Sequence, residues 1–414
     1  MAIQSMAVPA PAAARDRERA RRIRTRRGLE ERFGPGLSRL FSAPGRTEMG
    51  GNHTDHNRGL GLAAAVNADI LAAARPTSRP VIRLHSEGFY TDLIDLDDLS
   101  PREKETGHSA SLIRGVAAAL KARGFEVGGF DAFTTSEVPR GAGVSSSAAF
   151  EVLVAGILNG LYNESRVDPL TLAQVAQEAE NRHFGKPCGM MDQLTSALGG
   201  CISADFQRPH EPVCRRHPAD FARWGLRLCL VDTGGSHSDM TGEYAACRLE
   251  MLEVARLLGA TALREVDPAV FESRLPDLRA KAGDRAVLRT LHYFEENRRV
   301  ELQREALERD DRALFLRLVA SSGRSSQTLL QNIVPSGATR EQGTALALAL
   351  SERLLGADGA VRIHGGGFAG TVQAYVPLDR LEGYRRRMEA VFGEGCCHEL
   401  SVRTDGVTEY GDGE

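Results

Sequence analysis

The stretch Ser136-Glu-Val-Pro-Arg-Gly-Ala-Gly-Val-Ser-Ser-Ser-Ala-Ala-Phe150 decides how this sequence is interpreted, because it joins a glycine-rich loop to an apolar helix. Pro139 ends the preceding segment, since proline has no N–H to continue a strand ladder. Gly141 and Gly143 allow positive φ angles and a close approach to a ligand. Free N–H groups, the helix dipole and three serine hydroxyls at the following helix start favour an anion, and we predict a phosphate there.

Two common nucleotide-binding motifs are absent from this stretch. No Gly-Lys-Ser/Thr follows the glycines, so it is not a Walker A loop, and the G-x-G-x-x-G spacing of dinucleotide-binding proteins is missing. A glycine turn with a serine N-cap is the ordinary start of a helix and accounts for the same residues. Taken alone, the loop leaves phosphate binding and a plain helix start open.

The composition is that of a soluble globular protein. The chain has 414 residues, of which 42% are hydrophobic and 26% charged, and this length suffices for two or three domains. A formal net charge of -3 argues against a nucleic-acid-binding face. The longest apolar run, residues 59–74, is interrupted by Asn67 and Asp69 and is too short to span a bilayer. Seven cysteines without a C-x-x-C pair indicate a reducing compartment. We expect a cytoplasmic monomer or weak homo-oligomer without nucleic-acid or membrane partners.

A dense polar cluster follows an apolar segment between residues 40 and 57. Leu40-Phe-Ser-Ala-Pro-Gly-Arg46 precedes Thr47-Glu-Met-Gly-Gly-Asn-His-Thr-Asp-His-Asn57, which predicts a strand that delivers a loop into a cleft. His53, Asp55 and His56 are residue types that ligate metals, but no distant partner with metal-site spacing is evident. Sugar hydroxyls are the better match for this cluster, because Asp, Asn and His together offer donors and acceptors.

Strand and helix patterns follow one another without a regular βαβ rhythm, which predicts an α+β fold in two halves. An Ala- and Arg-rich extension, disordered or helical, is predicted over residues 1–32, with a solvated helix from Arg15 to Arg32. An N-terminal domain over residues 33–212 and a C-terminal domain over residues 213–414 follow. Leu226 to Asp232 reads as a strong strand. The highly charged segment from Phe271 to Glu308 is predicted to be a solvated helical hairpin rather than a binding surface.

Five stretches with motif character follow one another along the chain. They are Ala43-Pro-Gly-Arg46 with Gly51-Asn-His-Thr-Asp55, Val138-Pro-Arg-Gly-Ala-Gly-Val-Ser-Ser-Ser-Ala-Ala149, Cys188-Gly-Met-Met-Asp-Gln193, His237-Ser with Glu243-Tyr244, and Arg362-Ile-His-Gly-Gly-Gly-Phe-Ala-Gly370. In this order they resemble the galactokinase branch of the GHMP small-molecule kinases, over nearly the whole chain from about residue 35. The resemblance implies a two-domain GHMP kinase fold, with an N-terminal domain like that of ribosomal protein S5, a ferredoxin-like C-terminal domain and an active site between them.

The resemblance implies transfer of the γ-phosphoryl group of ATP to the anomeric hydroxyl of galactose, giving galactose 1-phosphate, with Mg²⁺ on the phosphates. Asp192 matches the catalytic acid-base position and Arg46 the arginine beside it, although a plain interdomain salt bridge would use the same pair. Ser147, with Ser146 as second candidate, and Glu180 match the metal ligands. The positions that match sugar contacts are Asn52, His53, Asp55, Gly189 and Tyr244. The ATP-binding positions are Pro139, Gly141, Ala142, Gly143, Val144, Ser145, Ser146, Ser147 and Ala148.

The sugar signature departs from the usual pattern of the branch. Asn52 stands where the branch has a glutamate for the sugar's terminal hydroxymethyl group, Glu48 replaces an asparagine and Gly50 a bulky aliphatic residue. Galactose is the leading substrate, and the alternative is a related sugar altered at C6, such as galacturonate, arabinose or a substituted galactose. Asn52 predicts weaker discrimination at C6, unless Glu48 or His56 supplies the missing acceptor. A catalytically silent sugar sensor is disfavoured, because the serine loop and Asp192 are both present.

Overall fold

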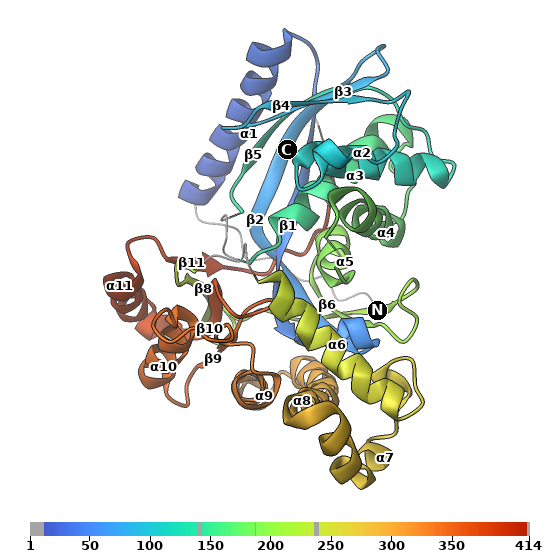
Figure 1. Cartoon of the computed structure of the whole chain (residues 1–414). Coiled ribbons are helices and arrows are strands. Elements are labelled where there is room, and N and C mark those ends of the chain that lie inside the picture. Colours follow the sequence, from blue (N-terminus) through green and yellow to red (C-terminus); the bar gives the residue numbers. More distant parts are fainter. Residues whose placement is uncertain (1–11, 139–142, 187, 236–239, 412–414) are drawn as a thin grey trace.

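A computed structural model describes residues 12–138, 143–186, 188–235 and 240–411 and contains two β-sheets, each covered by helices (Figure 1). The larger sheet has eight strands in the order β12-β1-β2-β5-β3-β4, with β6 beside β2 and β7 beside β6. The β3–β5 pair is parallel and the other pairs of this sheet are antiparallel. The strands are β1 (Arg39–Gly50), β2 (Leu60–Pro76), β3 (Val81–Ser86), β4 (Thr91–Asp95), β5 (Phe130–Ser136), β6 (Cys201–Asp205), β7 (Val213–His217) and β12 (Thr408–Tyr410).

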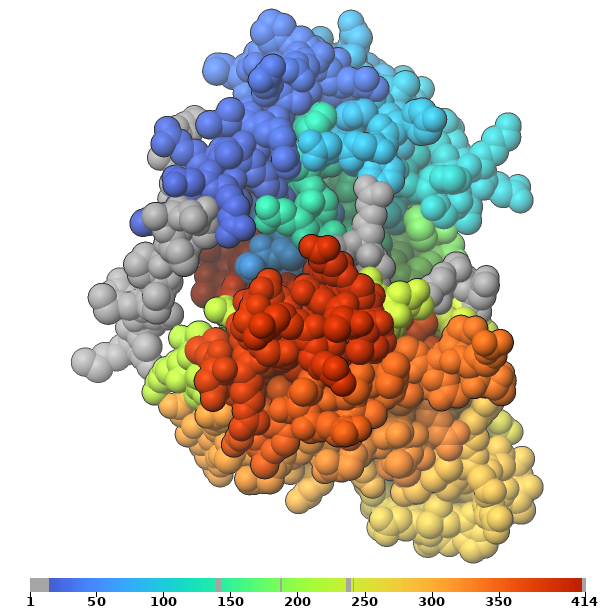
Figure 2. All heavy atoms as spheres, turned by 90° about the vertical axis from the view of Figure 1, so that its left-hand side faces the viewer, coloured from blue at the N-terminus to red at the C-terminus, as the bar shows by residue number. Residues whose placement is uncertain are grey.

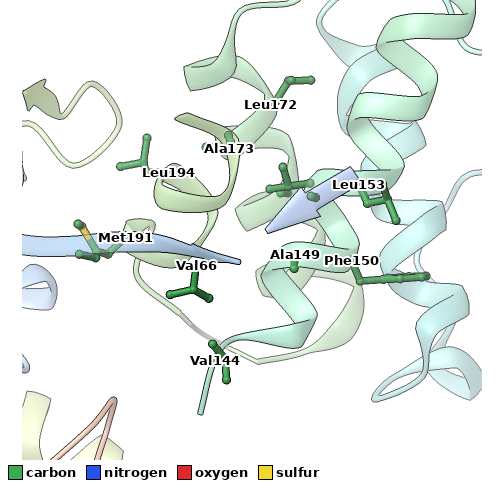
Figure 3. Packing of buried hydrophobic residues seen from close by; sticks show 14 of the residues in the cluster. Val66, Val144, Ala149, Phe150, Leu153, Leu172, Ala173, Met191 and Leu194 are labelled. Carbon is green, nitrogen blue, oxygen red and sulfur yellow. The ribbon is translucent and has the colours of Figure 1, made fainter. Parts of the chain in front are cut away.

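Helices pack on both faces of the larger sheet because its central strands are apolar on both sides. On one face lie α2 (Ser109–Ala122), α3 (Ser146–Tyr162), α4 (Pro169–Ala179) and α5 (Met191–Leu198), and on the other lies α1 (Ala12–Phe33) (Figure 1). The close view in Figure 3 shows Val66 of β2 near Val144, the residue that leads into α3, and Ala149 of α3. The apolar core therefore extends directly under the start of α3.

The smaller sheet is antiparallel, in the order β11-β8-β10-β9, and its two faces have different neighbours. One face packs Val231 and Val372 against α10 and α11, while Leu228 and Tyr375 on the other face join the core of the larger sheet. These elements are β8 (Leu226–Asp232), β9 (Ala360–Ile363), β10 (Thr371–Pro377), β11 (Cys397–Leu400), α10 (Gly343–Leu355) and α11 (Leu381–Phe392). Between β8 and β9 in sequence lie four further helices, α6 (Thr241–Leu257), α7 (Pro268–Ser273), α8 (Leu275–Glu308) and α9 (Arg312–Ser325).

The predicted α+β class is confirmed, and the strand predicted from Leu226 to Asp232 has the same bounds in the structure. Figure 2 shows the blue and cyan segments of the larger sheet above the orange and yellow helices of the second half, with the two halves in contact. The division at residues 212 and 213 stays a prediction. Strands β7 and β12, which follow residue 212 in sequence, pair within the larger sheet.

The prediction of a solvated helix from Arg15 to Arg32 is wrong for one face of α1. Arg21, Thr25 and Leu29 recur every four residues and are 4%, 0% and 0% exposed. The Arg21 guanidinium donates to Oδ1 of Asp69 on β2 at 2.5 Å and to the Thr135 carbonyl at 3.0 Å. Composition hid this face because Arg21 is charged and Thr25 is polar, so only Leu29 on it is apolar. Residues 1–11 of the predicted extension lie outside the described residues.

Loss of the Arg21 ion pair should destabilise the protein. We expect Arg21→Met to lower the free energy of unfolding by about 3 kcal/mol, because it leaves the buried Asp69 carboxylate with Arg403, at 2.9 Å, as its remaining cation. Urea unfolding measures the change. The matched control is Arg24→Met on the same helix, since Arg24 is 60% exposed in its pair with Glu87 and should contribute less than about 1 kcal/mol. Equal effects of both substitutions would contradict a structural role for the buried pair.

The prediction of a solvated hairpin from Phe271 to Glu308 is also wrong. Most of this segment is α8, which is kinked at Gly283, where φ is +84° and ψ is +167°. One face of the helix is buried although it is polar, and it carries Arg289, His292, Glu296, Arg299 and Gln303. These side chains recur every three or four residues, which is the helical period. Helix α8 is thus an internal support rather than a solvated element.

Candidate active site

The glycine-serine loop enters α3 through a residue with unusual backbone angles. Ser145 has φ +54°, in the left-handed region, and its side chain caps none of the α3 N–H groups. Its hydroxyl instead donates to Oδ2 of Asp192. The plain serine N-cap is therefore not what this residue forms. Val144, 1% exposed, anchors the loop in the core (Figure 3). The predicted ATP-binding residues Pro139, Gly141 and Ala142 lie outside the described residues.

The remaining loop residues differ in their exposure at the start of α3. Ser146 is the first residue of the helix and is exposed, whereas Ala148 is buried. Gly143 has φ +69°, and its carbonyl accepts a hydrogen bond from Nη1 of Arg46 at 2.5 Å. An exposed helix N-terminus with hydroxyls beside it is suited to an anion.

Arg46 on β1 and Asp192 on α5 form a two-point ion pair beside this loop. Nε of Arg46 donates to Oδ1 of Asp192 at 2.6 Å, and Nη2 donates to Oδ2 at 2.8 Å. Arg46 is 9% exposed and Asp192 35% in their side chains. The carboxylate is thus the more accessible partner. Because both residues also bond to the loop, the pair is tied to the predicted phosphate site and is not an isolated interdomain salt bridge.

The charge state of Asp192 follows from two opposed effects. Burial alone would raise the pKa of its carboxyl, but the Arg46 guanidinium, through charge and hydrogen bonds, and the Ser145 hydroxyl outweigh burial. The pKa of Asp192 is therefore lowered from its ordinary value. At neutral pH the residue is an ionised acceptor that keeps its position through three donors.

A second acid lies on the other side of the α3 start. Ser147 Oγ donates to Oε1 of Glu180 at 3.1 Å, and Gln193 Nε2 donates to Oε2 at 2.8 Å. Glu180 begins a π-helical turn after α4 and is 2% exposed. A hydroxyl and a carboxylate are hard oxygen ligands that suit Mg²⁺, which in kinases takes few protein ligands and several phosphate and water oxygens. The residues present therefore fit the predicted metal position.

Lys186 was not among the residues predicted from sequence. Its ammonium lies 3.0 Å from Oε1 of Glu180, and Glu180 raises the pKa of Lys186 although burial opposes this. The side chain is 62% exposed. A flexible cation beside a candidate metal ligand and a phosphate loop can also contact phosphate oxygens. The feature of the sequence that could have identified Lys186 is its position in the Gly/Pro loop that precedes Asp192.

Asp55 and Gly189, two of the predicted sugar contacts, meet directly. A Cβ atom on Gly189 would lie 1.7 Å from Oδ2 of Asp55, so only glycine allows this approach. Burial raises the pKa of Asp55, and the backbone N–H of His56 opposes the shift as it donates to Oδ1 at 2.8 Å. The structure thus brings Asp55 next to the loop that leads to Asp192.

Asn52, His53 and Tyr244 all reach the glycine motif between β9 and β10. Asn52 Nδ2 donates to the Gly365 carbonyl at 2.6 Å, His53 Nε2 lies 2.9 Å from the Gly366 carbonyl, and the Tyr244 hydroxyl donates to the Gly367 carbonyl at 3.3 Å. The His53 and Tyr244 rings stack with centroids 6.3 Å apart. Three consecutive carbonyls of the smaller half are therefore held by the two predicted sugar-binding segments.

Helix α8 supports the sugar signature from behind. His292 Nε2 donates to the Asn52 carbonyl at 2.9 Å, and the Gly51 N–H donates to Oε1 of Glu296 at 3.0 Å. Burial lowers the pKa of His292 to about 4, so the imidazole is neutral and donates from one nitrogen. Gln303 fills the space beside Gly50, where a Cβ atom would lie 2.1 Å from Oε1 of Gln303. This contact accounts for Gly50 in place of a bulky residue.

A metal site in the sugar signature is not supported. Over the part of the chain that the structure describes, no group of three or more His, Cys, Asp or Glu side chains could hold a metal ion.

None of the helices among the described residues is long and apolar enough to cross a membrane.

Two family models match the chain. The model described as "GHMP kinases N terminal domain" matches residues 111–200, and that described as "Galactokinase galactose-binding signature" matches residues 29–76. A galactokinase of Streptomyces coelicolor is 33% identical over 368 residues, which are 88% of this chain and 91% of the relative. A galactokinase of Actinobacillus pleuropneumoniae serotype 3 is 32% identical over 379 residues, 86% and 90% of the two chains.

Solved structures share the fold. Lactococcus lactis galactokinase complexed with galactose superposes with a TM-score of 0.80 at 22% identity, over 93% of this chain and 98% of that chain. Methanococcus jannaschii mevalonate kinase gives a TM-score of 0.63 at 13% identity, over 89% and 99% of the two chains. The predicted two-domain GHMP kinase fold is confirmed by these likenesses.

Proposed function

This chain belongs to the galactokinase family of GHMP kinases, and from that membership we propose that it transfers the γ-phosphoryl group of ATP to the anomeric hydroxyl of galactose, yielding galactose 1-phosphate and ADP. The observation that supports this proposal most is the Arg46–Asp192 pair, bound to the phosphate loop through Gly143 and Ser145. In this pair Asp192 can accept the proton of the sugar hydroxyl, and the adjacent Arg46 can neutralise the negative charge of the transferred phosphoryl group. Because two relatives are named galactokinases, we propose galactose rather than a sugar altered at C6 as the substrate.

Phosphoryl transfer requires positioning and charge neutralisation more than covalent chemistry. The exposed start of α3 and its hydroxyls would bind phosphate oxygens, and Lys186 would approach from the neighbouring loop. Asp192 would accept a hydrogen bond from the sugar's anomeric hydroxyl and orient its oxygen toward the γ-phosphorus. Because the pKa of Asp192 is low, it would take the proton only as the new P–O bond makes that hydroxyl strongly acidic. During the transfer, Arg46 would stabilise the negative charge on the equatorial oxygens of the phosphoryl group.

Mg²⁺ is the proposed metal, and Ser147 with Glu180 would hold it. When bound, the ion neutralises phosphate charge. The Glu180 carboxylate is oriented for this task by Gln193 at 2.8 Å. Asp55, His53, Tyr244 and the Gly189 backbone are the proposed sugar contacts, and the His53–Tyr244 stack joins the two halves of the molecule there.

The phosphate-side role of Ser147 gives a prediction. Ser147→Ala should raise the apparent KM for Mg·ATP or lower kcat by about 5- to 100-fold, because one oxygen ligand or donor is lost from a largely buried polar site. The KM for galactose should change much less. Titration of each substrate at saturation of the other measures the difference. Ser100→Ala is the matched control, because the Ser100 hydroxyl also donates to a carboxylate, that of Asp98, outside the candidate site, and its loss should change neither KM. Equal shifts in both apparent KM values would contradict the assignment.

A panel of free sugars tests the proposed function. The purified chain is incubated with ATP, Mg²⁺ and galactose, galacturonate, arabinose or glucose, and ADP release is followed with a coupled assay. We expect galactose to give the highest kcat/KM. A higher kcat/KM for galacturonate or arabinose would identify that sugar, instead of galactose, as the preferred substrate. No ADP release with any sugar would contradict the sugar kinase assignment.

A further inference from the structure

The side chain of Asn52 is enclosed by protein groups. Nδ2 donates to Oε1 of Glu48 at 2.9 Å and to the Gly365 carbonyl at 2.6 Å, and Oδ1 accepts from Nδ2 of Asn332 at 2.8 Å. Asn52 is 1% exposed. Both N–H donors are used and the amide oxygen is bonded, so this side chain has no open face for a sugar hydroxyl.

The carboxylate of Glu48 lies in the same network but keeps an open side. Oε1 accepts from Asn52 and, at 2.9 Å, from Nη2 of Arg362, which is fully buried on β9. The Glu48 side chain is 18% exposed. Among the described residues none donates a hydrogen bond to Oε2. A carboxylate held at one oxygen and open at the other is oriented to accept from a ligand.

The position of Glu48 along β1 relates it to the reacting centre. Arg46 and Glu48 are two residues apart in a regularly paired part of β1, opposite Ala65 and Ala63 of β2. Alternation therefore puts both side chains on one face of the strand, roughly 7 Å apart along it. Burial raises the pKa of the Glu48 carboxyl, and the charges of Arg362 and Arg46 oppose this shift, which agrees with this closeness. In a hexopyranose, C4 lies across the ring from the anomeric carbon, and C5, which carries the hydroxymethyl group, is bonded to C4.

We propose that Glu48, rather than Asn52, is the specificity-determining residue for the far end of the sugar, where its open carboxylate oxygen accepts a hydrogen bond from a hydroxyl at C4 or C6. This inference rests on the proposed function, which places the anomeric hydroxyl at Arg46 and Asp192. A neutral Asn52 acting alone predicts weak discrimination between sugars that differ at C6, whereas Glu48 in this role predicts strong discrimination. A fixed negative charge repels a C6 carboxylate, and a missing hydroxyl leaves the acceptor unpaired, so the site rejects both galacturonate and 6-deoxygalactose.

Arg362 and Asn52 are positioning residues in this arrangement. The Arg362 guanidinium also donates to the Glu48 carbonyl at 3.1 Å, so it fixes both the backbone and the carboxylate of one residue. Asn332 fixes the Asn52 amide orientation from the opposite side. The sugar signature therefore still contains a carboxylate, but Glu48 carries it instead of residue 52, and these two side chains are hydrogen-bonded to each other.

The test compares Glu48→Gln with the unaltered enzyme on galactose, 6-deoxygalactose and galacturonate. We expect Glu48→Gln to lower kcat/KM for galactose by roughly 10- to 100-fold, chiefly through KM, and to lower the galactose-to-galacturonate ratio at least about tenfold. Galactose binding without ATP, measured by calorimetry, should weaken by a similar factor. Glu105→Gln is the control, because Glu105 is 17% exposed and also pairs with a fully buried arginine, Arg114, at 2.7 Å, but lies outside the Glu48 network. It should leave the ratio unchanged.

A second variant keeps the proposal testable if Glu48→Gln does not fold. The exchange Glu48→Asn with Asn52→Glu restores one carboxylate to the pair and should recover most of the discrimination that Glu48→Asn loses. An unchanged sugar ratio in a folded Glu48→Gln protein, or no recovery in the exchanged protein, would overturn the proposal and leave Glu48 as the partner of Arg362 alone. Absence of galactose phosphorylation by the unaltered enzyme would instead overturn the proposed function.

Discussion

Asp192→Asn is expected to lower kcat for galactose phosphorylation by at least about 100-fold, because the amide keeps the shape of the side chain but accepts no proton. The amide also removes the charge that Arg46 pairs with, and it keeps one oxygen acceptor for the Ser145 hydroxyl. Galactose should still bind, with weaker affinity. Steady-state kinetics and calorimetric binding of galactose separate the two effects.

Asp205→Asn is the matched control for this prediction. Asp205 also forms an ion pair with an arginine, Arg264, at 2.8 Å, but outside the candidate active site. This substitution should leave kcat within about twofold, as surface substitutions usually have small effects. If Asp192→Asn kept more than about a tenth of the unaltered rate, Asp192 would not be the proton acceptor.

Arg46→Gln should have the second largest effect and should change the pH dependence. We expect kcat to fall by about 100- to 1000-fold, because a preorganised cation is lost where phosphoryl charge develops. In the unaltered protein Arg46 is the main group that holds the pKa of Asp192 below its ordinary value, against burial. Without Arg46 burial prevails and the pKa rises. Activity of the variant should therefore be lost, as pH falls, at a higher pH than in the unaltered enzyme.

The pH profile of kcat/KM between about pH 4.5 and 8 measures this shift. Arg46→Lys is the control, because it keeps the positive charge but loses the two-point geometry. It should lower kcat while its acid limb stays closer to that of the unaltered enzyme. An acid limb that is unmoved in Arg46→Gln would show that Arg46 does not control the ionisation of Asp192.

Sequence reasoning was most successful where a local pattern determines the structure. Leu226 to Asp232 contains the continuous apolar run from Leu228 to Val231, and such a short run is typical of a buried strand. The buried helix after the glycine-serine loop was likewise predicted, because its apolar residues lie within a few positions of one another. The pairing of Arg46 with Asp192 came from the family resemblance, since 146 residues separate them.

The failures share one physical cause, which is burial of polar residues against distant partners. Helix α8 was read as solvated because its buried stripe is made of Arg289, His292 and Glu296 rather than aliphatic residues. A period of three to four residues in those polar positions was the signal that hydrophobicity alone missed. Asn52 was assigned to the sugar by its place in the motif. Its direction is decided by Asn332 and Gly365, about 300 residues away in sequence.

The most direct test of the account is identification of the product made from galactose and Mg·ATP. Phosphorus NMR of the reaction mixture should show a phosphate monoester coupled to the anomeric proton of galactose, formed in equal amount with ADP by the unaltered enzyme and at least about 100-fold more slowly by Asp192→Asn. A phosphate ester coupled to the C6 protons, or ADP formed without any sugar phosphate, would contradict the account.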